Sequence, residues 1–191
     1  MLLASYVGTR SGIMGLGNRI IRLRLVEGGH KWSEAFKTNA SDPFGPLRAS
    51  HTELVFEPED DVSVFMPDKS CMYDDEGKLW CFSSTGTERV HPESRRRANH
   101  IGGARFKRID VYNDRWSLQR ITRVDPKLVA ARCESNAGQL YDWQNILGFA
   151  SWIIPHKKDR RMCSELVMEM LGVRESYRVD PCMAIVVAEH L

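Results

Sequence analysis

Four strand-like segments follow one another before any helical pattern begins, and this order constrains the fold more than any other feature of the sequence. The clearest segment reads SHTELVF and places His51, Glu53 and Val55 on one predicted face, with the residues between them on the other. Strands grouped ahead of helices are typical of α+β proteins, whereas doubly wound folds alternate strand and helix. We therefore expect an α+β fold in which an antiparallel sheet packs against helices. The four segments are residues 50–56, 78–85, 104–111 and 115–121, and a separate strand is predicted at residues 2–8.

Three helices are predicted after the strands. Asp125 can cap the first, because its carboxylate can accept from backbone N–H groups and a proline follows it at the first helical position. A second helix is predicted over residues 141–153. The last begins near Cys163 and ends at Gly172, since glycine readily takes the left-handed conformation that closes helices. The apolar stretch at residues 183–188 fits either an edge strand or a short helix.

Length and charge are those of an ordinary globular protein. The 191 residues fit one domain spanning residues 1–191. The formal net charge is +2, which by itself implies neither a nucleic acid nor a membrane partner. Basic runs at residues 95–97 and 157–161 are interpreted as solvated loops, and the alternative is that either attracts an anionic polymer such as a cell-wall glycan chain, a lipid headgroup or a nucleic acid. Nucleic-acid binding is disfavoured, because aromatic interleaving and a recognised binding motif are absent.

Several classes of protein are excluded by patterns that the sequence lacks. No apolar run approaches the roughly 20 residues that a membrane span needs, and the opening MLLASYVGTRSG lacks the apolar core of a signal peptide. We therefore expect no transmembrane segment, and synthesis in the cytoplasm without a signal peptide. The five cysteines are odd in number and form no CxxC pair, which favours free thiols over a disulfide framework or a zinc site.

Cys163 stands at the beginning of the last predicted helix, in the stretch RRMCSELVMEMLG. The positive end of a helix, together with the basic residues that precede it, favours a thiolate over a thiol. Apolar residues at helical spacing make one buried stripe on the same side as Cys163. Because most free cysteines are simply buried apolar residues, this pattern fits a filler as well as a nucleophile.

A nucleophilic cysteine needs a base, and His51 is the best placed of the six histidines because it lies on a strand with a defined face. A third polar group must hold the imidazole in the productive tautomer. Glu53 shares the face of His51, and Ser83, Ser84 or Thr85 on the next strand could lie across from it. The residues alone do not decide among these.

Several short motifs together resemble one family of enzymes. The motifs SHTELVF, CFSSTG, GGARFKRIDV with RWSLQRI, YDWQNILGF and CSELVMEML are similar, in this order, to the permuted NlpC/P60 branch of the papain-like cysteine hydrolases. This branch includes the YiiX-like group and the group related to lecithin-retinol acyltransferase, and many small members come from phages and prophages. The resemblance covers roughly residues 48–172, and residues 90–100 are longer than the family pattern. It implies a permuted papain-like fold in which the histidine strand comes first and the nucleophile helix lies near the C-terminus.

The resemblance also implies an activity and a site. Cys163 corresponds to the nucleophile and His51 to the general base, with Glu53 as the expected third residue, Ser83 and Ser84 as rivals, and Tyr141 lining the site. The implied function is hydrolysis of an amide or peptide bond in bacterial peptidoglycan, in a protein carried in a phage virion or tail, with no metal or organic cofactor. One alternative is a lipid or acyl-amide hydrolase or acyltransferase, which predicts an apolar groove beside the cysteine. The other is a non-catalytic virion assembly protein that keeps the fold, which predicts an occluded cysteine.

Overall fold

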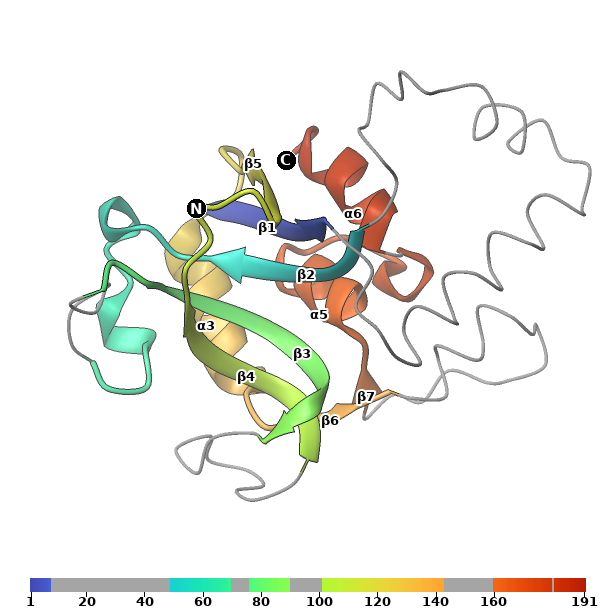
Figure 1. The fold of residues 1–191 in the computed structure, drawn as a ribbon, viewed down its shortest axis with the longest axis horizontal. Coiled ribbons are helices and arrows are strands. Elements are labelled where there is room, and N and C mark those ends of the chain that lie inside the picture. Colours follow the sequence, from blue (N-terminus) through green and yellow to red (C-terminus); the bar gives the residue numbers. More distant parts are fainter. Residues whose placement is uncertain (8–48, 70–75, 90–100, 143–159, 180) are drawn as a thin grey trace, which may run out of the picture.

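The centre of the molecule is a five-stranded antiparallel sheet with the strand order β4-β3-β2-β1-β5 (Figure 1). The computed structural model describes residues 1–7, 49–69, 76–89, 101–142, 160–179 and 181–191. The strands are β1 (Leu2–Val7), β2 (Ala49–Val55), β3 (Leu79–Arg89), β4 (Ile101–Ile109) and β5 (Trp116–Arg120). All five predicted strands are therefore confirmed. Strand β3 continues beyond residue 85 to Arg89, and β4 begins at Ile101, before the predicted residue 104.

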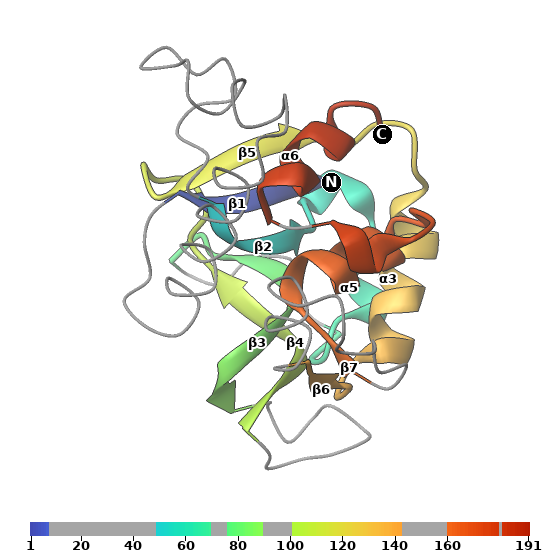
Figure 2. The same cartoon turned by 90° about the vertical axis from the view of Figure 1, so that its right-hand side faces the viewer.

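Helices of the described part of the chain lie on one face of this sheet, so the fold is α+β (Figure 2). They are α3 (Pro126–Asn136), α5 (Cys163–Met170) and α6 (Pro181–Ala188). Helix α5 packs on β2 and β3, α6 packs on β1, β2 and β5, and α3 contacts α5. Single 3₁₀ turns cover Pro58–Asp60, Ser63–Phe65 and Ser176–Arg178, and two short strands, β6 (Leu140–Tyr141) and β7 (Arg160–Arg161), pair in parallel.

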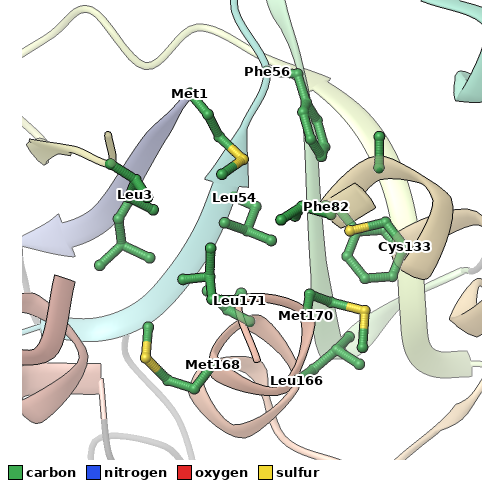
Figure 3. Close-up of a cluster of buried hydrophobic side chains, with 14 of the residues drawn as sticks. Met1, Leu3, Leu54, Phe56, Phe82, Cys133, Leu166, Met168, Met170 and Leu171 are labelled. Atoms are coloured by element: carbon green, nitrogen blue, oxygen red, sulfur yellow. The ribbon is translucent and has the colours of Figure 1, made fainter. Parts of the chain in front are cut away.

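The main hydrophobic core fills the space between the sheet and the helices (Figure 3). Leu54 and Phe82 point into it from neighbouring strands, and Leu166 and Met170 point into it from α5. Phe82 also packs on Phe106, with 4.8 Å between ring centroids. The opposite face of the sheet carries a smaller cluster that includes Val55 and Cys81. Since α5 supplies a large share of the core, the position of its first residue is fixed by packing.

The helix start capped by Asp125 and the helix end at Gly172 are confirmed. The Asp125 carboxylate accepts a hydrogen bond of 3.0 Å from the backbone N–H of Lys127. Gly172 closes the segment after α5 with a φ of 84°, a conformation that costs glycine little. The stretch at residues 183–188, which fitted a strand or a helix, is helical, because Pro181 occupies the first helical position of α6.

Two predictions were wrong. Tyr141 was expected to begin a helix, but it lies in β6, because its backbone pairs with Arg161 of β7. The remainder of that predicted helix lies outside the described residues. Arg160 and Arg161 were expected in a solvated loop, yet they form β7 and are partly buried. No helix in the described ranges is long and apolar enough to cross a membrane.

Candidate active site

Cys163 is the first residue of α5 and is fully buried. The strand β7 leads directly into this helix, with Met162 as the residue before the first turn. The first N–H groups of a helix have no partner within it, so they form a positive end beside the cysteine sulfur. The Glu165 carboxylate accepts from the backbone N–H of Met162 at 3.4 Å and so closes the first turn. The predicted placement of Cys163 at a helix start is therefore observed.

The sheet is open where α5 begins. Strands β2 and β3 pair only at Leu54–Phe82 and Val55–Cys81, before the ladder reaches the end of β2 that carries His51. Beyond this point a side chain replaces the backbone ladder, because the Ser83 hydroxyl donates to the carbonyl of Thr52 at 2.5 Å. Cys163, the first residue of α5, interacts with His51 in this part of β2, beyond the last pair with β3.

Ser84 holds the segment that leads into Cys163. Its hydroxyl donates to the carbonyl of Arg161 at 2.8 Å, and the backbone N–H of Asp142 donates to the same carbonyl at 3.2 Å. Ser83 and Ser84 were the alternatives to Glu53 as the third residue of the site. Both hydroxyls donate to backbone carbonyls. Tyr141 is buried and lies beside this segment through the pairing of β6 with β7.

His51 brings the remaining predicted residues together. Its Nε2 lies 2.7 Å from Oε1 of Glu53, and because a carboxylate only accepts, Nε2 carries the proton of this bond. This leaves Nδ1 as the ring nitrogen that can exchange a proton with sulfur, and Cys163 lies close enough to His51 to help raise the pKa of its imidazole. His51 is 4% exposed and Glu53 is fully buried. Cys163, His51 and Glu53 thus form one continuous chain of contacts.

Arg105 of β4 completes this chain and was missed by the sequence reasoning. Its Nη1 donates to Oε2 of Glu53 at 3.0 Å, and its Nη2 donates to Oε1 at 2.9 Å. Arg105 is 3% exposed, so the two-pronged pair is shielded from water. The available signal was weak: GGARFKRIDV alternates, so Arg105 shares a predicted strand face with Ile109, and an arginine beside an apolar residue suggests partial burial.

The charges within the chain shift two pKa values in opposite directions. Burial alone lowers the pKa of His51, but the Glu53 carboxylate and Cys163 outweigh burial and raise the pKa from 6.5 to about 9. Burial alone raises the pKa of Glu53, but the Arg105 guanidinium and His51 outweigh it and lower the pKa from 4.5 to about 2. At neutral pH, Glu53 is therefore ionised and His51 is protonated.

Two other buried cysteines show what an ordinary thiol does in this interior. Cys81 and Cys133 are as fully buried as Cys163. Burial raises the pKa of Cys81 and of Cys133 well above the usual value, so both remain neutral thiols. They provide matched internal controls for the reactivity of Cys163. Within the described ranges, no group of three or more His, Cys, Asp and Glu side chains could hold a metal ion.

The two pKa shifts predict how stability changes with pH. His51 has a raised pKa, so its stabilising contribution is complete below pH 6.5 and is lost as the pH rises through about 9. Glu53 has a lowered pKa, so its contribution is complete above pH 4.5 and is lost as the pH falls through about 2. We expect the urea midpoint to be highest between these limits and to fall on the alkaline side in the wild type more than in His51→Gln. A wild-type midpoint that climbs steadily from pH 6.5 to 9 would contradict this assignment.

Comparison with known proteins adds no relative: no family model, no curated protein and no solved structure matches the chain. The chemistry of the site therefore has to be argued from the contacts among Cys163, His51, Glu53 and Arg105.

Proposed function

We propose that this protein is a cysteine hydrolase that cleaves an amide or peptide bond, with Cys163 as nucleophile and His51 as general acid and base. The observation that supports this most is the buried chain from Cys163 through His51 to Glu53. An activated cysteine, a base and a group that orients the base are the three parts that nucleophilic catalysis requires. Buried charged groups are also costly, and strongly shifted pKa values gather at functional sites.

In the proposed mechanism, His51 holds the proton of Cys163 in the resting enzyme, leaving a thiolate at the start of α5. The thiolate sulfur attacks the carbonyl carbon, and the N–H groups at the helix start stabilise the oxyanion that forms. His51 then gives its proton to the leaving amine as the C–N bond breaks, which leaves an acyl-enzyme thioester. Finally, His51 takes a proton from water, the hydroxide displaces the thioester sulfur, and the carboxylic acid product leaves.

The proposed fold family is the permuted papain-like one. Its support is the order of the parts along the chain, because the histidine strand β2 precedes an antiparallel sheet and the cysteine helix α5 follows it. The proposed substrate is a peptide or amide bond of bacterial peptidoglycan, and the proposed setting is a phage virion or tail. Both follow from the family resemblance of the sequence motifs, so the substrate assay below includes an acyl-amide lipid as a second arm.

One observation favours a second candidate, a non-catalytic assembly protein that keeps the fold. Cys163 has no exposed surface, and an occluded cysteine is what this alternative predicts. The two candidates differ in whether the sulfur can react. A catalytic thiolate must meet a small electrophile, whereas a structural thiol at this position should behave like the other buried cysteines.

The reactivity of Cys163 tests the proposal. Native protein is treated with iodoacetamide, and the rate of modification of each cysteine is followed by peptide mass spectrometry. Because only a thiolate attacks the reagent, we expect Cys163 to react at neutral pH at least tenfold faster than Cys81 and Cys133, which are equally buried. Cys163→Ala should abolish release of peptide or amine from purified sacculi, or of fatty acid from the acyl-amide lipid. If Cys163 reacts no faster than the two controls, and the Cys163→Ala protein retains its biological activity, the assembly candidate is supported instead.

A further inference from the structure

Arg105 contacts the proposed site through Glu53, and it reaches that carboxylate from two strands away. Strand β3 lies between β4 and β2 in the sheet. Ser83 of β3 is paired directly with Arg105, and the alternation of β2 and β3 places Glu53 on the same face as Ser83. A serine at this position is small enough to let the guanidinium pass to Glu53. A larger residue at position 83 would occupy the space between the two charges.

The contact is two-pronged and almost fully shielded from water. Both guanidinium Nη atoms donate to Glu53, and Oε1 of Glu53 also accepts from Nε2 of His51. The carboxylate is therefore held by three charge-assisted hydrogen bonds, and rotation of the carboxyl group would break at least two of them. The orientation of His51 depends on Oε1, and the orientation of Oε1 depends on Arg105.

The charges balance only when Arg105 is included. With Cys163 as thiolate and His51 as imidazolium, the chain from Cys163 to Arg105 contains two negative and two positive groups. Without Arg105, only the His51 imidazolium would oppose the two negative groups, Glu53 and the Cys163 thiolate. The buried site would then carry a net negative charge. A like charge in a buried site disfavours ionisation.

We propose that Arg105 is a positioning residue of this site, one that holds Glu53 so that Glu53 keeps His51 oriented and protonated toward Cys163. This inference rests on the hydrolase function proposed above. Arg105 donates to both carboxylate oxygens of Glu53, so it acts on the site through Glu53. Its contribution is to keep the resting pair as thiolate and imidazolium, not to take part in a bond change.

The other charged groups around the site are engaged elsewhere. On α5, the Glu165 carboxylate accepts from Met162 and lies 3.5 Å from Nε of Arg161. Glu169 of α5 is paired with the Arg161 guanidinium of β7 at 2.5 Å. On β3, burial keeps Cys81 a neutral thiol. The charged groups that act on His51 are therefore Glu53 and Cys163, and Arg105 is the cation that lowers the pKa of Glu53.

The rate of Cys163 alkylation as a function of pH tests this role without any substrate. One full charge several ångströms away, in an effective dielectric near 20, is worth on the order of one pH unit. The alkylation rate rises with pH over a limited range, which is the low-pH limb of the profile. We expect Arg105→Met to shift this limb to higher pH by about one unit, which makes the reaction about tenfold slower at a given pH on the limb. Arg105→Lys keeps the positive charge and should leave the limb close to that of the wild type. A folded Arg105→Met protein with an unmoved limb overturns the inference.

A double variant covers the case in which Arg105→Met does not fold. Glu53→Gln with Arg105→Met removes both charges together and leaves neither buried without a partner. We expect the pKa of His51 in this protein, followed by NMR, to fall by about one unit or more, while Arg105→Lys leaves it close to that of the wild type. An unchanged pKa of His51 in the double variant would overturn the inference, because it would show that the pair does not act on His51. Wild-type Cys163 that alkylates no faster than Cys81 and Cys133 would instead reject the hydrolase function itself.

Discussion

Replacing Glu53 by alanine is expected to lower the free energy of unfolding by about 3–5 kcal/mol, which is the usual cost of removing one partner from a buried ion pair. The guanidinium of Arg105 would remain in the interior without its counter-charge, because arginine does not lose its proton in proteins. His51 would lose the same carboxylate. The measurement is urea unfolding near pH 6, where both shifted groups contribute fully.

The control for this prediction is a glutamate whose side chain is exposed to solvent. Glu59→Ala removes an exposed carboxylate and is expected to change the free energy of unfolding by less than about 0.5 kcal/mol. Added salt should leave the Glu53→Ala effect nearly unchanged, because buried charges are poorly screened. A loss below about 1 kcal/mol would mean that Arg105 finds another partner or water, and that the pair is less isolated than its burial indicates.

Phe82→Ala is expected to cost about 3–5 kcal/mol through a cavity in the core. Phe82 is fully buried between the sheet and the helices, and its ring packs on Phe106. The space left behind borders rigid strands on one side, so it cannot close without moving α5. Thermal and urea unfolding of the variant give the loss of stability directly.

The control for Phe82→Ala is a large apolar residue that lies outside the core. Val64 is 63% exposed, so Val64→Ala is expected to change stability by less than about 0.5 kcal/mol. The Phe82→Met variant fills much of the cavity with a flexible side chain and should recover part of the lost stability. An equal effect of Phe82→Ala and Val64→Ala would show that the core can repack around the missing ring.

Those parts of the molecule that depend on local chemistry were predictable from the sequence. The alternation of residues 50–56 indicated β2 and put His51 and Glu53 on one face, and the two side chains are indeed in contact. The start of α5 at Cys163 followed from the apolar stripe that comes after it, and its closing segment followed from Gly172. In each case a few neighbouring residues carry the signal.

Other parts depend on which distant segments pair, and no local pattern encodes that. Strands β6 and β7 have two residues each, too few for any periodicity, so Tyr141 was misassigned to a helix. The choice between Glu53 and the serines required the register of β2 on β3. Predicting the contact of Arg105 with Glu53 required the register of β3 on β4 as well. From the sequence, Cys163 was either a buried apolar residue or a nucleophile with a histidine partner. In the structure, Cys163 is buried and also interacts with His51.

The early end of the ladder between β2 and β3 has a consequence for how the site forms during folding. His51 and Cys163 are far apart in the chain, and they meet only where this ladder is open. Contacts of such high sequence separation form late, after the entropy of closing long loops has been overcome. An incompletely folded chain would therefore carry a cysteine with ordinary thiol chemistry. In the proposed hydrolase, Cys163 would therefore gain the contact with His51 that activates it only once the sheet and α5 are assembled.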